Sequence, residues 1–361
     1  MAISPYKTFI AGEVLSAADL NASFLQIINN ARSLISPLTA SLDMDGFELI
    51  LDADADTSIT ADTDDQIDFR VGGSDIVSIT ATGINNSGRL RYTSSTLTLS
   101  SGAVTGTRAF HLIAAESSTS DDFDTLTTTN YAAGDIVYLQ ADSGDTIYVT
   151  TAGNFRRPML LRDTRPIAVM WSGTKWELVQ HGWVLLDVQT AATSAQLDFL
   201  KGIGSGYSSF EFHLHNILPA TDGSALWLRV AEDTVPTIQS DAADYEHHIV
   251  SKESNGTGWT TVVSSQGDAK IILVNQVIGS GAGEGAVGVI EFFAPSATAN
   301  HHFQSRISCF TSAATPLHQF SESTGAYNGS TAAIQAVRLL MNAGGAANIA
   351  SGSAALYGLL E

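Results

Sequence analysis

The pattern of apolar and polar positions changes along this chain of 361 residues. Near the N-terminus, apolar side chains recur at alternating spacings of four and three, whereas short runs that alternate apolar and polar residues fill the rest. The first spacing is typical of a helix that packs as a coiled coil, and the second is typical of β-strands. The sequence therefore predicts a mainly β protein that begins with one helix.

The predicted helix belongs to a first segment, residues 1–40. Ser16 and Asp19 have the spacing of a capping box at its start, and Pro37 should end it. Its apolar seam consists of Leu20, Phe24, Ile27, Ala31, Leu34 and Leu38. We expect this seam to pack on copies of itself as a coiled coil, because no compact domain follows. The alternative is a helix packed on its own domain.

Residues 41–90 form an acidic segment with short alternating runs at 67–71 and 76–79. Eleven Asp and Glu residues between 43 and 75 are opposed by Arg70 alone. Glycines at 46, 72–73 and 83 separate the runs. Strands this short and sparsely apolar cannot build a private core, so we expect an intertwined stalk in which several chains share one.

Two further β-regions follow. Residues 91–181 predict a small β-module that ends in a hairpin, with runs at 167–171 and 176–179 and with Trp171 and Trp176 closing a core. Residues 182–361 contain many short strands and no long helix; Phe210, Phe212 and Leu214, for example, alternate with polar residues. This pattern predicts an antiparallel, jelly-roll-like β-sandwich at the C-terminus.

Charge and composition exclude several classes of partner. The formal net charge is −20, which disfavours nucleic acid and anionic membrane surfaces. No apolar run approaches the ~20 residues of a membrane span, and the first residues lack the apolar core of a signal peptide. We therefore expect a soluble protein made in a cytoplasm. Cys309 is the only cysteine and is interpreted as a buried thiol.

Two motifs that resemble ligand-binding loops fail on inspection. Gly283, Gly285 and Gly288 match the dinucleotide spacing, but a strand follows them where the fingerprint needs a helix. The run Asp52-Ala-Asp-Ala-Asp56 begins like a calcium loop, yet it has Thr57 and Thr63 where an EF-hand needs Gly and Glu. Calcium held between strands by Asp62, Asp64 or Asp65 remains an alternative to a solvated acidic face.

Histidines form the other candidate cluster. His213 and His215 point to one face of a strand, whereas the pairs 247–248 and 301–302 place their rings on opposite faces. A metal at the first pair is the weak alternative to ordinary exposed side chains. No hydrolase, P-loop or metalloprotease motif occurs. No coil-by-coil period of a parallel β-helix is visible either. We therefore expect no enzyme, no catalytic residue and no cofactor.

Several segments carry a family resemblance. Residues 9–21, 36–39, 42–46 and 62–73 resemble the N-terminal part of tail fibre proteins of tailed bacteriophages, over about the first quarter of the chain. The run 171–178 is similar to small β-modules in such fibres. The C-terminal block resembles fibre tips in pattern only. Collagen-like repeats and a recognisable C-terminal chaperone are missing, which indicates a short fibre.

This resemblance implies a homotrimer on the exterior of a virion, with the tail as the expected place of attachment, assembled in the host cytoplasm. Its N-terminus would dock on a baseplate, tail or capsid protein and hold the trimer through Phe9, Leu20, Phe24, Ile27 and Leu34. Its C-terminal sandwich would bind a host cell-surface glycan or protein. On a threefold axis, three copies of His213 and His215 would present six nitrogens to one metal ion.

Within this reading, aromatic residues in loop contexts are the candidate receptor contacts, namely Tyr207, Trp259 and Tyr327. Three other functions remain as alternatives. The chain could be a capsid or tail structural protein with no receptor role, a tailspike-like polysaccharide depolymerase, or a bacterial surface adhesin. The missing signal peptide argues against the adhesin.

Overall fold

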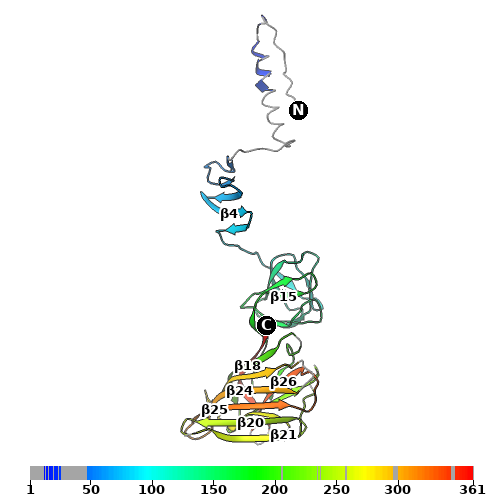
Figure 1. Cartoon of the computed structure of the whole chain (residues 1–361), viewed down its shortest axis with the longest axis vertical. Coiled ribbons are helices and arrows are strands. Elements are labelled where there is room, and N and C mark those ends of the chain that lie inside the picture. Colours follow the sequence, from blue (N-terminus) through cyan, green and yellow to red (C-terminus); the bar gives the residue numbers. More distant parts are fainter. Residues whose placement is uncertain are drawn as a thin grey trace. The chain divides into compact units, whose positions relative to one another are not determined.

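The computed structural model describes residues 12, 14, 16–18, 20–22, 24–25 and 47–360, apart from 205, 234, 236, 257, 296–299 and 343–345. The chain divides into two compact units, residues 1–91 and 92–361, whose elements Figure 1 labels. The sequence pattern places the boundary between the predicted stalk and the predicted β-module at residues 90–91, next to the boundary between these two units. Strands arranged in several sheets dominate the described residues, as the alternating pattern predicts.

The N-terminal segment is described only in part. Helical turns occur at residues 17–18, 20–22 and 24–25, and the Leu20 amide donates to the Ser16 carbonyl oxygen at 3.1 Å. Leu20 and Phe24 are exposed, whereas Phe9, Ile27 and Leu34 lie outside the described residues. The trimeric coiled coil therefore stays a prediction. In the part of the chain that is described, no helix combines the length and the apolarity needed to cross a membrane.

The first unit contains a five-stranded antiparallel sheet in the order in which its strands occur along the chain. Tight turns at Gly72–Gly73 and before Gly83 connect the strands, and Gly72 and Gly73 both have positive φ angles. The strands are β1 (Leu49–Ile50), β2 (Ser58–Thr60), β3 (Gln66–Val71), β4 (Ser74–Thr80) and β5 (Gly83–Asn86).

The second unit begins with a module in which successive passes of the chain stack in parallel. β8 lies between β6 and β11, β10 pairs with β7, and β12 pairs with β9, all in parallel. These pairs lie in three separate sheets, so the passes form short stacked coils. The strands are β6 (Ser95–Thr98), β7 (Ala103–Thr105), β8 (Phe110–Ala114), β9 (Ser120–Phe123), β10 (Thr125–Thr127), β11 (Ile136–Ala141) and β12 (Thr146–Val149).

The stacked coils correct the sequence interpretation, which found no coil-by-coil period. Equivalent positions are unevenly spaced: Ser95 pairs with His111, 16 residues later, whereas Phe110 pairs with Tyr138, 28 residues later. Loops of different length between the strands produce this difference. A search for a fixed period therefore fails, although each pass of the chain lies directly beside the previous one.

Antiparallel strands complete the module, and the predicted hairpin is confirmed. β13 (Met159–Arg162) pairs with β12, and β14 (Ile167–Trp171) pairs with both β11 and β15 (Trp176–Leu178). Trp171 and Trp176 lie opposite each other with ring centroids 5.4 Å apart. The buried Trp176 donates its indole N–H to the Leu126 carbonyl oxygen at 3.0 Å, so this pair closes the core as expected.

The rest of the second unit is a sandwich of two antiparallel sheets (Figure 1). The larger sheet has eight strands in the order β16-β28-β18-β23-β24-β25-β20-β21. Its strands are β16 (Gly182–Thr190), β18 (Ser209–Pro219), β20 (Tyr245–Glu253), β21 (Thr260–Asp268), β23 (Ala286–Phe293), β24 (His301–Phe310), β25 (His318–Tyr327) and β28 (Ile349–Leu360).

The smaller sheet has the order β17-β26-β19-β22, with a short β27 beside β26. The chain passes repeatedly from one sheet to the other, so the hydrophobic core between them forms from all parts of residues 182–360. The strands of this sheet are β17 (Gln196–Phe199), β19 (Ser224–Ala231), β22 (Ile271–Ile278), β26 (Ala336–Asn342) and β27 (Ala346–Ala347).

Small side chains allow the two sheets to approach closely at β25 and β22. The buried Ser323 hydroxyl donates to the Ile272 carbonyl oxygen at 2.8 Å. A Cβ atom at Gly325 would lie 2.9 Å from the Ile271 side chain and 3.0 Å from the Glu246 carbonyl oxygen, which is too close for any other residue. The predicted buried thiol is also confirmed, since Cys309 lies in this core.

Candidate functional site

One face of the sheet in the first unit is apolar and exposed to solvent. Residues paired across antiparallel strands share a face. The register of β1 to β5 therefore places on one side a set that we name the apolar stalk face: Leu49, Ile59, Ile67, Phe69, Val71, Val77, Ile79 and Ile84. Exposure within this set ranges up to 70% for Ile84, and even the central Phe69 is 37% exposed.

The opposite face of the same sheet is mostly polar, and the residues at its centre are buried. Asp68 is only 1% exposed and accepts two hydrogen bonds from the Gln66 amide, at 2.8 and 2.9 Å. Hydrogen bonds from Ser78 and Gln66 hold the pKa of Asp68 below its ordinary value. The Arg70 guanidinium lies within 3.9 Å of the carboxylates of Glu48, Asp62 and Asp75. Local hydrogen bonds and ion pairs therefore satisfy the charged groups of Asp68 and Arg70 on this face.

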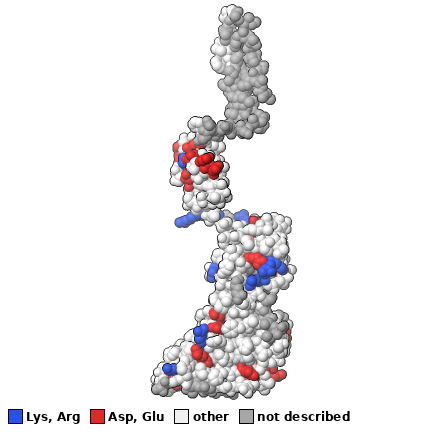
Figure 2. Space-filling model, in the orientation of Figure 1, with Lys and Arg blue, Asp and Glu red and all other residues white. Residues whose placement is uncertain are grey.

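This sheet is thus inverted relative to an ordinary two-sided sheet, in which the apolar face is the covered one. Fully burying an Ile or Phe side chain stabilises a structure by about 1.5–3 kcal/mol. A face of eight such residues is therefore suited to association. Carboxylates crowd the described part of the first unit in Figure 2, and their mutual repulsion disfavours association through the polar face.

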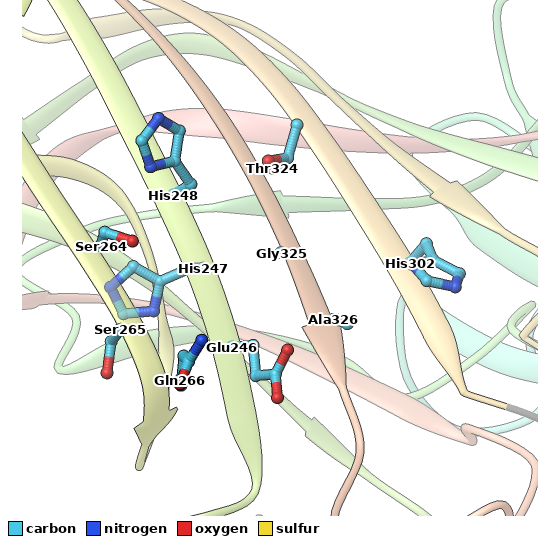
Figure 3. Close-up of a pocket in the computed structure, with 10 residues that line it drawn as sticks. All are labelled: Glu246, His247, His248, Ser264, Ser265, Gln266, His302, Thr324, Gly325 and Ala326. Atoms are coloured by element: carbon cyan, nitrogen blue, oxygen red, sulfur yellow. The ribbon is translucent and has the colours of Figure 1, made fainter. Parts of the chain in front are cut away.

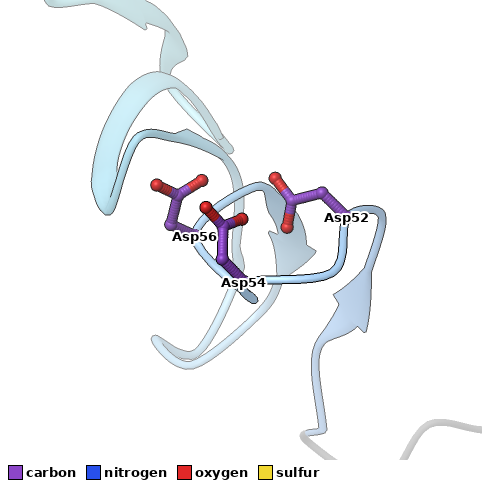
Figure 4. Close-up of side chains that lie close together, drawn as sticks. All are labelled: Asp52, Asp54 and Asp56. Atoms are coloured by element: carbon purple, nitrogen blue, oxygen red, sulfur yellow. The ribbon is translucent and has the colours of Figure 1, made fainter.

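Three carboxylates in the β1–β2 loop form the one set of potential metal ligands among the described residues. Asp52, Asp54 and Asp56 place carboxylate oxygens within 4.8 Å of one another (Figure 4). Hydrogen bonds from Thr57 lower the pKa of Asp52. Oxygen ligands of this kind suit Ca²⁺ or Mg²⁺, although exposed acidic loops also occur without any ion.

The outer face of the eight-stranded sheet is polar and carries a shallow hollow (Figure 3). Glu246 and His248 on β20, Thr324 and Ala326 on β25, and His302 on β24 line it. The hollow forms because the small Ala326 separates the longer side chains of Glu246 and His302 in one cross-strand row. The Asn328 amide donates to the Glu246 carboxylate at 3.1 Å, which fixes one wall.

The adjacent histidines behave as the sequence predicts. His248 and His302 are exposed on the outer face, whereas His247 and His301 are buried on the inner face. Burial lowers the pKa of His247, and neither of its ring nitrogens has a hydrogen-bond partner among the described residues. This histidine is therefore a neutral core residue at the floor of the hollow.

A strip of aromatic rings lies further along the same outer face, and we name it the aromatic strip: Trp259, Phe320, His318 and Phe310. Trp259 packs edge to face on Phe320, with ring centroids 5.8 Å apart, and Phe310 packs in the same way on His318 at 5.7 Å. Lys252, Glu253 and Ser254 join Trp259, His318 and Phe320 around a hollow of about 210 Å³.

Of the three predicted receptor contacts, the structure leaves Trp259 exposed and buries the other two. The Tyr207 hydroxyl donates to the Pro158 carbonyl oxygen at 2.5 Å, and the Tyr327 hydroxyl donates to the Glu232 carboxylate at 2.5 Å. Both rings lie in the core, so neither presents a surface to a receptor. Their loop-like sequence context was misleading, because their partners are distant along the chain.

The predicted histidine pair lies on the outer face of β18. The His213 Nε2 atom is 2.8 Å from a Glu211 carboxylate oxygen, and its ring packs 4.8 Å from that of Tyr357. His215 is exposed. Within one chain, the described residues supply no cluster of three metal ligands here. A metal shared between copies of the chain stays a prediction.

Sequence reasoning missed a cleft between the stacked coils and the sandwich, of about 670 Å³. The Lys201 ammonium pairs with Asp122 and lies 4.8 Å from the centre of the Tyr148 ring. The Tyr148 hydroxyl donates to Asp187 at 2.9 Å, and burial raises the pKa of this aspartate. These groups satisfy one another and form a polar joint at one side of this otherwise largely apolar cleft.

The hollow shown in Figure 3 could not be predicted from the sequence either, because its residues come from four strands. The aromatic strip had a weak signal, namely Trp259 in a glycine-containing turn and His318 and Phe320 at alternate positions. No family model, no curated protein and no solved structure matches this chain. Its function must therefore be argued from the geometry of these surfaces.

Proposed function

We propose that this chain is a homotrimeric structural fibre on the exterior of a tailed-phage virion, which attaches the particle to a host cell through its C-terminal sandwich. The observation that carries the proposal is the exposed apolar stalk face. A side chain such as Ile84, 70% exposed in one chain, belongs in an interface. The resemblance of residues 9–21 and 62–73 to phage tail fibres supplies the biological setting.

Copies of the same chain are the best partners for this face. Three sheets that turn their apolar faces toward a common axis would bury those faces together and leave the acidic faces in water. Closure of this kind also leaves Arg70 and its carboxylate partners undisturbed. The helix predicted before the sheet would align the chains, and its N-terminal end would dock on a virion protein.

The receptor role is supported by the outer face of the eight-stranded sheet. The exposed Trp259 ring beside a hollow is accessible to a ligand, and aromatic side chains supply much of the free energy at binding sites. Three copies on one fibre would add their weak contacts through multivalency. A virion structural protein with no receptor role is the competing function.

Light scattering on the purified full-length chain tests the oligomeric part. We expect about 114 kDa, three times the 38.0 kDa of one chain. A stable mass of 38 kDa would overturn the fibre proposal.

The receptor role is tested by incubating the fluorescently labelled full-length protein with a panel of Gram-negative and Gram-positive strains. Saturable adhesion to at least one strain supports attachment, and adhesion to none favours the purely structural alternative.

A further inference from the structure

We propose that the aromatic strip is a carbohydrate-binding site, and that Trp259 stacks against a pyranose ring of the host receptor. This inference rests on the proposed attachment function and names the chemical class of the receptor. It starts from one observation: the Trp259 side chain is 52% exposed, and its ring packs on Phe320 beside a hollow.

The local fold holds this indole in place. The Gly256 amide donates to the Glu253 carbonyl oxygen at 3.0 Å and closes a tight turn after β20. The Ser254 amide donates to the His318 carbonyl oxygen at 2.8 Å and ties that turn to β25. Phe320 then supports the edge of the Trp259 ring at an interplanar angle of 68°. The ring is therefore positioned before any ligand arrives, which reduces the entropic cost of binding.

The chemistry of the hollow matches that of a sugar. A pyranose ring has an apolar face of C–H groups and a rim of hydroxyl groups. The indole face suits the first, while Lys252, Glu253 and Ser254 offer donors and acceptors to the second. The volume of about 210 Å³ is smaller than the ~300–1,000 Å³ of pockets for drug-sized ligands, which suits one sugar ring.

The strip can also accommodate more than one ring. Phe310 lies directly opposite His318 in the β24–β25 register, so both side chains project from the outer face. Phe310 and His318 pack edge to face at 72°, as Trp259 and Phe320 do at 68°. Two aromatic contacts in succession would favour an oligosaccharide over a single sugar. The charged side chains beside Trp259 have both signs, so the hollow favours a sugar that carries no net charge.

The test is saturation-transfer NMR with the full-length protein and a panel of methyl glycosides of glucose, galactose, mannose, rhamnose, N-acetylglucosamine and N-acetylgalactosamine. We expect transfer to at least one glycoside, with a dissociation constant near 1 mM at a single site, or about −4.1 kcal/mol. Trp259→Ala should weaken that binding at least tenfold, and Phe320→Ala should weaken it several-fold. Trp183→Ala is the matched control, because Trp183 is also largely exposed but lies on β16, far from the strip in the strand order.

The other outcomes either overturn the inference or separate it from the attachment function. Absence of transfer to every glycoside, or full binding by a folded Trp259→Ala variant, removes the sugar site. A lower solution mass for Trp259→Ala would mean that the strip is a contact between copies of the chain. If the wild type adheres to cells while the glycosides fail, the attachment function stands and the receptor is not a sugar. If it adheres to no strain yet binds a glycoside, the site stands and the attachment function fails.

Discussion

The five-stranded sheet of residues 49–86 and the eight-stranded sheet of the sandwich alternate apolar and polar side chains in the same way, but they expose opposite faces. In the larger sheet, Phe292 and Phe303 face a core and Gln304 faces solvent. In the five-stranded sheet, Asp68 is buried while Ile67 and Phe69 face solvent. One sheet is covered by a core within its own chain, whereas the other leaves its apolar face open, and in the proposed trimer neighbouring chains would cover that face.

The largest effect is expected when the apolar stalk face is made charged. The double substitution Ile67→Asp and Ile79→Asp would remove six isoleucines from the interface of a trimer, each worth about 1.5 kcal/mol or more. We expect the association constant of the trimer to fall at least about 10⁴-fold, which is about 5.5 kcal/mol. Light scattering at micromolar concentration should then give the mass of one chain.

Thr82→Asp is the matched control, because it adds the same charge at an exposed turn between β4 and β5. Its mass should equal that of the wild type. If the double variant stays trimeric, the apolar stalk face has no role in assembly. The proposed difference between the two sheets would then be wrong.

The converse substitution removes a core residue of the eight-stranded sheet. Phe292 is fully buried and stacks on Phe303 with centroids 4.2 Å apart. We expect Phe292→Ala to destabilise the second unit by about 3–5 kcal/mol, because it deletes burial and leaves a cavity. Urea unfolding followed by tryptophan fluorescence measures this unit alone, because all five tryptophans lie between residues 171 and 259. The solution mass of this variant should not change before unfolding.

A smaller effect is expected from the buried His247. Because burial lowers its pKa in the folded protein, only the unfolded chain gains a proton as the pH falls through about 6.5. Stability is therefore complete above that pH and decreases below it. Between pH 7.5 and 5.5, the wild type should lose more stability than His247→Gln in urea unfolding. Asp268 opposes this shift and Lys270 adds to it.

His248→Gln is the control for this pH dependence, since His248 is the adjacent residue and lies exposed on the outer face. It should lose as much stability as the wild type over the same interval. If both variants lose equal amounts, the pH dependence has another origin.

The smallest effect is expected on the solvent side of the larger sheet. Gln304→Ala changes a polar, exposed position beside the buried Phe303. We expect less than about 0.5 kcal/mol in the same urea experiment, as for most surface positions without specific partners. A loss comparable to that of Phe292→Ala would show that the outer face of the eight-stranded sheet is covered in the assembled protein. Both sheets would then have a face that is covered only on assembly.

Much of the fold could be predicted from local pattern alone. Alternation and turn residues indicated the strand at 67–71 and the hairpin closed by Trp171 and Trp176, because these depend on neighbours in sequence. The parallel coils could not be predicted, since their pairing joins residues such as Phe110 and Tyr138 across loops of unequal length.

The candidate site was predictable only in part for a related reason. The exposure of Trp259 follows from a short, tight turn that sequence can indicate. The burial of Tyr207 depends on a carbonyl oxygen at Pro158, 49 residues earlier, which no local pattern indicates. The exposure of a side chain is thus predictable where local structure alone determines it. It is not predictable where the side chain contacts a segment that is distant along the chain.

The stacked coils of the second unit have a consequence for how such a protein can evolve. Each pass of the chain lies against the next at the ~4.8 Å separation of neighbouring strands. A whole coil inserted between β8 and β11 would therefore increase the height of the module in one such step. The antiparallel end at β14 and β15 and the joint with the sandwich near Tyr148 would keep their own contacts. Insertion and deletion of coils could thus adjust the height of this module while the segments on either side of it stay unchanged.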